Sequence, residues 1–437
     1  MAPRPRHMHD PGMPDPNDKP ATHLRTTDLR GASRLAVDAT LGLTRLVENL
    51  HHNILRTPLP LGETSHTPTT GITGLVYRSI RGVTRLVGGS LDALLGQAQR
   101  LTGTASALPS EQREAVLAAL NGVLGDQLQA KANPLAISMQ LRSEGVALEL
   151  TSTALAKRFA QPSGRIVVLA HGLCMNDHQW LRHGHNHGAV LAQSVGMTPL
   201  YLHYNSGLHV STNGRQFAAL LEALLKAWPV PVEQLCIVGY SMGGLLARSA
   251  CHEAQQTGQA WLARLRQLVF VGTPHHGAPL ERGGRWLDAA LGLSPYTAAF
   301  SRLARLRSAG VTDLRHGSVL DSDWADTDRF AHARDSRGVV PLPAHVDCYA
   351  VAASLSKVAV NHDAALLGDV LGDVLGDVLG DGLVPVASAL GRHKTARRRL
   401  PFAADHQRIV YGTSHLGLLD NAEVSAQLLA WLAPTSA

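Results

Sequence analysis

The run Gly239-Tyr-Ser-Met-Gly243 has the clearest chemical potential in the chain, because it places a serine between two glycines. A strand-like apolar run at 235–238 precedes it, and a helix-like run begins at Met242. A tight strand–turn–helix of this kind exposes the serine hydroxyl at a helix N-terminus, where free N–H groups favour developing negative charge. The pattern therefore predicts Ser241 as the nucleophile of a serine hydrolase.

A nucleophilic serine needs a general base, and His415 is the best placed of the 23 histidines. It follows the last strand-like run at 408–411, beyond the carboxyl end of a strand, where the ligand crevice of a parallel sheet forms. The order Ser, acid, His then selects Asp381, which follows the strand-like run at 346–352. Asp381 is expected to accept a hydrogen bond from His415 and fix its tautomer.

Other carboxylates compete with Asp381 for the role of the acid. Three of them share its Gly-Asp context within Leu-Gly-Asp-Val repeats: Asp369, Asp373 and Asp377. Only Asp381 is followed by Gly-Leu-Val-Pro, and Asp405 precedes the last strand, at the wrong end of the sheet. The repeats match neither an EF-hand nor a nonapeptide calcium loop, which favours an expanded surface loop over a calcium site.

An oxyanion hole requires two donors, and two backbone amides are predicted to supply them. The first is the N–H of Met242, directly after the nucleophile. The second is the N–H of Leu173, in the loop after the strand-like run at 165–170. Four neighbouring residues are predicted to contact the substrate: His171, Gly172, Trp180 and Tyr240. Leu173 and Trp180 would favour an aliphatic acyl chain.

Metal and redox chemistry find little support in the sequence. The histidine groups at 183–187 and 275–276 lack carboxylate or cysteine ligands at the spacing of known zinc sites. The four cysteines form no CxxC pair, which favours reduced thiols over a disulfide framework. We therefore expect no metal and no cofactor.

Alternating strand-like and helix-like runs extend over residues 134–437, and a β-hairpin around 143–145 opens them. Such alternation predicts the α/β class, with a mostly parallel sheet and helices on both faces. Residues 280–345 break the alternation and are predicted to form a cap over the active site.

The part before the catalytic domain differs in composition. Residues 1–30 are rich in Pro, Asp and Arg and are predicted to be a disordered tail. Residues 31–130 are predicted to be a helical N-terminal region, with helices over 35–55, 72–95 and 111–128. We expect these helices to pack against protein, with peripheral lipid contact as the alternative.

Charge and hydropathy restrict partners and location. The formal net charge is +6, and the basic residues are spread along the chain. A nucleic-acid partner would require a concentrated basic face or a reader module, so none is expected. No run approaches 18 uninterrupted apolar residues, and the first thirty residues hold no apolar core of a signal peptide. We therefore predict no transmembrane span and a cytoplasmic location.

From about residue 165 to 432 the chain resembles bacterial α/β-hydrolase lipases and esterases, especially the PGAP-like group akin to the catalytic domain of GPI inositol-deacylase. The motifs around His171, Ser241, Asp381 and His415 carry the resemblance, with Val-Gly-Thr-Pro-His-His-Gly-Ala-Pro at 271–279. It implies the α/β-hydrolase fold and a carboxylic-ester hydrolase that acts on lipid-like esters. The repeats before Asp381 and the N-terminal helical region depart from the family pattern. Acyl transfer by the same triad, or an idle scaffold that binds lipid or protein, remain alternatives.

Overall fold

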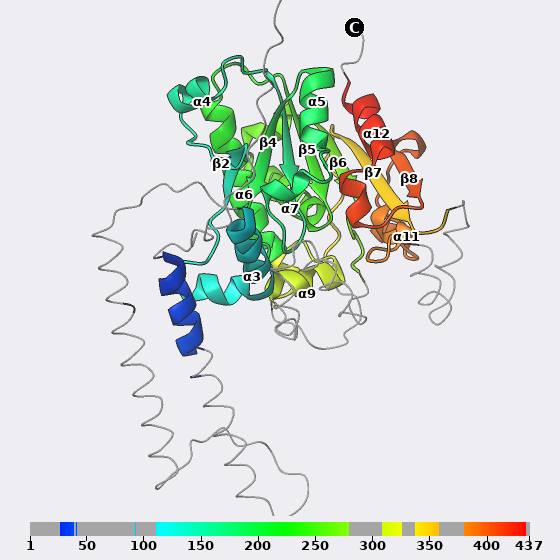
Figure 1. Cartoon of the computed structure of the whole chain (residues 1–437). Helices are drawn as coiled ribbons and strands as arrows, with labels where there is room; N and C mark the ends of the chain where they lie inside the picture. Colours follow the sequence, from blue (N-terminus) through cyan, green and yellow to red (C-terminus); the bar gives the residue numbers. More distant parts are fainter. Residues whose placement is uncertain are drawn as a thin grey trace, which may run out of the picture. The chain divides into compact units, whose positions relative to one another are not determined.

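The computed structural model describes residues 27–38, 41, 92, 111–278, 308–325, 337–357 and 380–433 (Figure 1). The chain divides into two compact units, residues 1–110 and residues 111–437. The predicted helices over 35–55 and 72–95 lie almost wholly outside the described residues. The Leu-Gly-Asp-Val repeats and much of the predicted cap at 280–345 also lie outside them.

In the first unit, a helical stretch covers residues 27–38, so helix begins a few residues before the predicted end of the tail. Arg30 and Arg34 on this stretch both pair with the carboxylate of Asp92, at 2.8 and 2.5 Å. Hydrogen bonds from Arg34 and Arg30 hold the pKa of Asp92 well below its usual value. These ion pairs join segments that are far apart in the sequence.

The second unit is built on one eight-stranded sheet in the order β2-β1-β4-β3-β5-β6-β7-β8. The strands from β4 to β8 in this order pair in parallel, and β1 pairs antiparallel with both β4 and β2. The strand bounds are β1 (Gln140–Ser143), β2 (Val146–Ala147), β3 (Arg165–Ala170), β4 (Thr198–His203), β5 (Gln234–Tyr240), β6 (Leu265–Val271), β7 (Asp347–Ser354) and β8 (Gln407–Tyr411). The mostly parallel sheet of the predicted α/β fold is confirmed.

Helices cover both faces of the sheet (Figure 1). Their bounds are α3 (Glu111–Ala130), α4 (Ser152–Arg158), α5 (His187–Val195), α6 (Val210–Ala227), α7 (Met242–Thr257), α9 (Ala309–His316), α11 (Val386–Ala389) and α12 (Ala422–Leu432). Short 3-10 turns complete the described elements: η1 (Asp177–Trp180), η2 (Ala260–Arg264), η5 (Asp321–Asp323), η7 (Ala396–Arg398), η8 (Ala404–His406) and η9 (Leu416–Leu419).

The central strands are apolar on both sides because each face is packed against helices. Ile166 and Val168 of β3 belong to a core with α6 and α7. Val167 and Leu169 of the same strand point the other way, into a core with α5 and α12. Side chains alternate between the two faces of a strand, so a continuous apolar run predicts this doubly covered position.

Two boundaries differ from the sequence prediction for identifiable reasons. Strand β5 continues to Tyr240 instead of ending at 238, because Gly239 and Tyr240 still pair with β6. The helix-like run in the sequence covers 214–228, but α6 begins at Val210, because the carboxylate of Asp313 accepts a hydrogen bond from the Val210 N–H at 2.7 Å. This N-terminal partner comes from α9, about a hundred residues later in the chain, and no local pattern signals it.

Helix α3 lies in the second unit, together with the sheet. By sequence pattern, its residues belong to the predicted helical N-terminal region at 31–130. The structure instead packs it against α9 and against the loops after β3 and β4. The link between the two units therefore falls before Glu111 and not at about 130.

Within the part of the chain that the structure describes, no helix combines the length and the apolar character needed to cross a bilayer.

Candidate active site

Ser241 occupies a strained turn at the carboxyl end of β5. Its φ and ψ are 54° and −119°, a backbone conformation that costs a non-glycine residue free energy and persists only where the surroundings enforce it. The Ser241 N–H donates to the carbonyl of Val271 at 2.8 Å, which ties the turn to the end of β6. A Cβ on Gly239 would lie 2.6 Å from the Cα of Gly244, so strand and helix approach too closely for a larger residue. This is the geometry of a nucleophile elbow.

His415 and Asp381 form a buried pair, as predicted from their order in the sequence. The Nδ1 of His415 lies 2.6 Å from Oδ2 of Asp381, and both residues are only 3% exposed. The other oxygen of Asp381 accepts hydrogen bonds from the N–H groups of Leu383 and Val384, at 2.9 and 2.7 Å. With Nδ1 directed at the carboxylate, Nε2 is the nitrogen that can take a proton from a hydroxyl.

The predicted base and nucleophile both lie against the dipeptide Val271–Gly272, where β6 ends and the next loop begins. Ser241 is bonded to Val271, and a Cβ on Gly272 would lie 3.0 Å from Cε1 of His415. The hydroxyl of Tyr240 also donates to the carbonyl of His415 at 3.1 Å. These contacts bring both catalytic candidates to the carboxyl end of β6. The competing candidates Asp369, Asp373 and Asp377 lie outside the described residues.

The loop after β3 lies directly over the nucleophile. A Cβ on Gly172 would be 3.2 Å from Cβ of Ser241. The N–H of Cys174 donates to Oγ of Ser206 at 3.0 Å, which engages that amide and leaves Leu173 as the loop's predicted oxyanion donor. Burial raises the pKa of the Cys174 thiol to about 12, so the thiol is protonated at neutral pH and is no rival nucleophile.

Three of the four predicted substrate contacts are packed beneath the site. His171 and Trp180 are fully buried and Tyr240 is 1% exposed. The His171 ring stacks on Tyr204, with ring centroids 4.3 Å apart, and its Nδ1 lies 2.8 Å from the Gly172 carbonyl. Burial lowers the pKa of His171 to about 3, so it is neutral and donates through Nδ1. These residues hold the loop and the elbow, and their contact with substrate stays a prediction.

A pocket of 280 Å³ opens beside His415. Its lining is mostly apolar and comes from Leu355, Asp381, Gly382, Leu383, Ser414, His415 and Leu416. Asp381 and His415, the predicted acid and base, therefore form part of the wall of a cavity that suits an apolar group.

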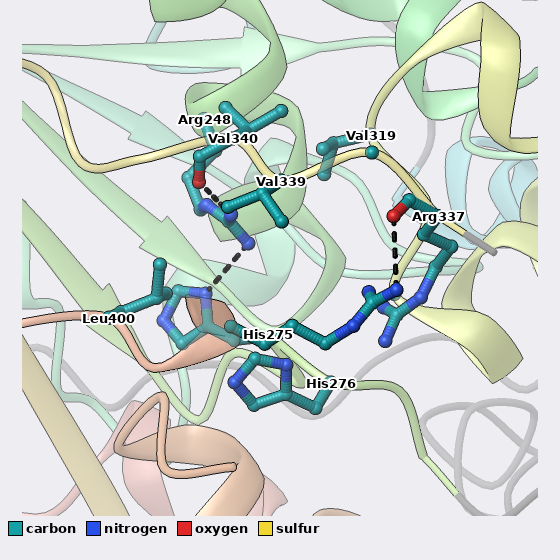
Figure 2. Close-up of a pocket in the computed structure, with 11 residues that line it drawn as sticks. Arg248, His275, His276, Val319, Arg337, Val339, Val340 and Leu400 are labelled. Carbon is teal, nitrogen blue, oxygen red and sulfur yellow. Dashed lines mark hydrogen bonds between the residues drawn. The ribbon is translucent and has the colours of Figure 1, made fainter. Parts of the chain in front are cut away.

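The histidines of the 275–276 pair lie in a different, basic pocket, which Figure 2 shows. Arg248 donates to the carbonyl of Val340 at 2.7 Å and to Nδ1 of His275 at 3.4 Å. Burial and the neighbouring Arg248 charge push the pKa of His275 well below its usual value. Burial likewise brings the pKa of His276 to about 4. His275 thus serves as a neutral acceptor for a buried arginine.

The histidines at 183–187 fasten helices together. His187 Nε2 donates to the carbonyl of Leu418 at 2.9 Å, and its Nδ1 lies 2.8 Å from Oγ of Ser425. His183 pairs with Asp420 at 2.5 Å. These bonds fix α5 and α12 to the turn that follows His415. Among the described residues, no group of three or more His, Cys, Asp or Glu could hold a metal ion.

Several supporting residues were not identified from the sequence. Tyr204 donates its hydroxyl to the carbonyl of His171 at 2.9 Å, and Ser206 holds Cys174. Gly122 and Gly125 of α3 face these loops. A signal for the glycines did exist, since glycine inside a helix costs stability and indicates a close approach.

One protein family and several solved structures are similar to parts of this chain. Residues 161–369 match the family described as PGAP1-like alpha/beta domain. Among curated proteins, no sequence matches the chain. Similar solved structures include the mature lipase BlEst2 of Bacillus licheniformis, with 18% identity and a TM-score of 0.41 over 68% of this chain and 98% of that one. Another is lipase 1 of Pelosinus fermentans, with 12% identity and a TM-score of 0.39 over 63% of this chain and 100% of that one. Residues 161–369 are thus similar to a PGAP1-like alpha/beta domain, and the mostly parallel sheet between helices has the α/β-hydrolase fold.

Proposed function

We propose that this protein hydrolyses carboxylic esters through an acyl-enzyme formed on Ser241. The observation that carries the proposal is the convergence of a strained serine and a buried His–Asp pair on Val271 and Gly272. Burial of a histidine against a carboxylate provides a base that can receive the proton of the hydroxyl. The family match over 161–369 supports a fold on which this chemistry occurs.

The first half of the reaction forms the acyl-enzyme. Oγ of Ser241 attacks the ester carbonyl carbon while Nε2 of His415 takes the hydroxyl proton. Asp381 stabilises the imidazolium through its 2.6 Å contact with Nδ1. The N–H groups of Met242 and Leu173 hold the oxyanion of the tetrahedral intermediate. Collapse breaks the bond to the alkoxy oxygen, and His415 gives its proton to the departing alcohol.

In the second half, water replaces the alcohol. The water oxygen attacks the acyl carbon while His415 takes a proton from the water. The second tetrahedral intermediate then expels Ser241 Oγ. His415 returns the proton to Oγ, and the carboxylic acid leaves. Acyl transfer would follow the same steps with another alcohol in place of water.

The substrate class we propose is a lipid-like ester. The apolar pocket beside His415 supports it, because Leu355, Leu383 and Leu416 in its wall would pack against methylene groups. Each methylene removed from water there would add about 0.8 kcal/mol to binding.

The test is hydrolysis of p-nitrophenyl esters with acyl chains from two to sixteen carbons by wild type and Ser241→Ala. We expect the substitution to lower kcat by roughly 10⁴-fold or more, with the folded state retained by thermal unfolding. Adding alcohols during the reaction separates hydrolysis from transfer, since only transfer yields a new ester. A Ser241→Ala protein with wild-type activity would overturn the proposal.

A further inference from the structure

We propose that helix α3 is a positioning element of the active site, which holds the oxyanion loop, defined here as residues 171–177, in register with Ser241. Gly122 and Glu114 are the positioning residues through which it acts. The inference rests on the proposed function, because it assigns the N–H of Leu173 to the oxyanion. It gives a positioning role to a helix that precedes the sheet in the chain and lies outside the residues matched to the family.

The first contact joins the middle of α3 to the backbone beside Leu173. A Cβ on Gly122 would lie 2.9 Å from Cα and 3.0 Å from N of Cys174, and it would overlap the Cys174 Sγ. Helix and loop therefore meet without an intervening side chain. Cys174 itself has a φ of 60°, so the loop turns sharply at the point where it rests on the helix. Any larger residue at Gly122 must push the loop or the helix aside.

The second contact holds the other end of the oxyanion loop. Arg142 of β1 donates to Glu114 of α3 at 3.0 Å and to Asp177 at 3.1 Å, and all three are buried. Burial raises the pKa of Asp177, but the hydrogen bond with His203 and the charge of Arg142 outweigh it and bring the pKa to about 2. Asp177 thus keeps its negative charge while buried, because His203 and Arg142 stabilise the ionised carboxylate. Helix α3 therefore contacts the loop directly at Cys174 and through Arg142 at Asp177.

The third set of contacts fixes the helix itself. Oγ of Ser308 donates to the carbonyl of Gly122 at 2.6 Å, and the N–H of Ala309 donates to Asp126 at 3.1 Å. Nδ2 of Asn205 donates to the carbonyl of Gly125 at 3.0 Å. Since Ser206, next to Asn205, accepts from the N–H of Cys174, the helix and two loops form one connected unit.

This arrangement matters because an oxyanion donor acts only within a narrow range of positions. Donors must lie about 2.7–3.1 Å from the oxyanion, and catalytic groups tolerate displacements of about 0.5 Å. A shift of the loop by a few tenths of an ångström should weaken transition-state stabilisation. It should leave the binding of the ground-state ester almost unchanged, because the ester contacts other surfaces.

Gly122→Ala in the full chain is the direct test, with Gln129→Ala as the matched comparison. Both place an alanine on the same helix, where alanine has the highest helix propensity. Gln129, however, is exposed, whereas a Cβ at Gly122 meets the backbone of the oxyanion loop. We expect Gly122→Ala to lower kcat by about ten- to a hundredfold with KM within about twofold of wild type. Gln129→Ala should lower kcat by less than about threefold.

A burst titration with a p-nitrophenyl ester separates misplacement from misfolding. It counts acylable Ser241 sites, so we expect Gly122→Ala to keep its sites and lose rate per site. Cys174→Gly added to Gly122→Ala should recover part of kcat, because it removes the overlapping Sγ and suits the positive φ. If Gly122→Ala yields no folded protein, Cys174→Ala decides: lower kcat at full site number supports the inference, and wild-type kcat overturns it.

The outcomes distinguish this inference from the function on which it rests. Equal kcat per site in wild type, Gly122→Ala and Gln129→Ala would overturn the role of α3 and leave the ester hydrolase intact. No wild-type hydrolysis, or full hydrolysis by Ser241→Ala, would instead overturn the proposed function.

Discussion

The elbow that holds Ser241 and the oxyanion loop above it lie within a few ångströms of each other, yet they are specified in different ways. About a dozen consecutive residues specify the elbow, from the strand before Gly239 to the helix after Gly243. The oxyanion loop is held by α3, β1, β4 and α9, which are far apart in the chain. A local motif can therefore be recognised in the sequence, whereas a site supported by distant elements can be lost through changes outside any motif.

The largest expected effect is a loss of kcat when the His415–Asp381 pair beside the elbow is altered. Asp381→Asn should lower kcat by roughly 10⁴-fold, because the amide no longer fixes the tautomer of His415 or stabilises its cation. Asp405→Asn, at the rejected acid, is the control and should retain wild-type kcat. Steady-state hydrolysis of a short ester measures both. Wild-type activity in Asp381→Asn would move the acid to another residue.

A change in the distant support of the oxyanion loop comes next. Arg142→Met should lower the free energy of unfolding by up to about 3–5 kcal/mol, because the buried carboxylates of Glu114 and Asp177 would lose the arginine that they share and keep only Arg113 and His203 beside them. Arg158→Met breaks an ion pair with the exposed Glu144 and should cost about 0–1 kcal/mol. Denaturant unfolding compares the two. Equal losses of unfolding free energy in the two variants would mean that the buried ion pairs do not fasten α3 to the oxyanion loop.

A change inside the elbow should have a smaller effect on stability. A Cβ at Gly243 would overlap the carbonyl oxygen of Ala170, which cannot move without disturbing β3. We expect Gly243→Ala to lower the free energy of unfolding by about 1–3 kcal/mol and to reduce kcat as well. Denaturant unfolding and ester hydrolysis check this together. A stable and fully active variant would show that the elbow is looser than its contacts indicate.

The smallest effect is a dependence of stability on pH. Burial lowers the pKa of His187 from 6.5 to about 4 in the folded chain. Between these values the unfolded chain binds a proton that the folded chain does not, so stability falls as the pH decreases from 6.5 to about 4. His187→Gln should flatten this fall by up to about 1.4 kcal/mol per pH unit, whereas His345→Asn, at an exposed site, should not. Unfolding curves across this range provide the measurement, and identical slopes in all three proteins would rule the effect out.

The difference between the two regions also explains what could be predicted from the sequence. Strand β3 matches its predicted bounds, and Asp381 and His415 meet as expected, because period, order and turn residues are local signals. The start of α6 was missed because its partner Asp313 is supplied by α9. The place of α3 was missed because its two glycines are explained only by the loops that they touch. The burial of His171 and Trp180 could not be predicted, because a motif indicates proximity to the nucleophile and not depth in the fold.

The most direct test of the central claim is to trap the acyl-enzyme. The full-length protein would be mixed briefly with p-nitrophenyl acetate, quenched in acid, digested and examined by mass spectrometry. We predict an acetyl group on the peptide that contains Ser241, formed at a rate matching the burst of p-nitrophenol and absent from Ser241→Ala. Turnover without acetylation of Ser241, or an adduct on another residue that forms and decays at the turnover rate, would contradict the account.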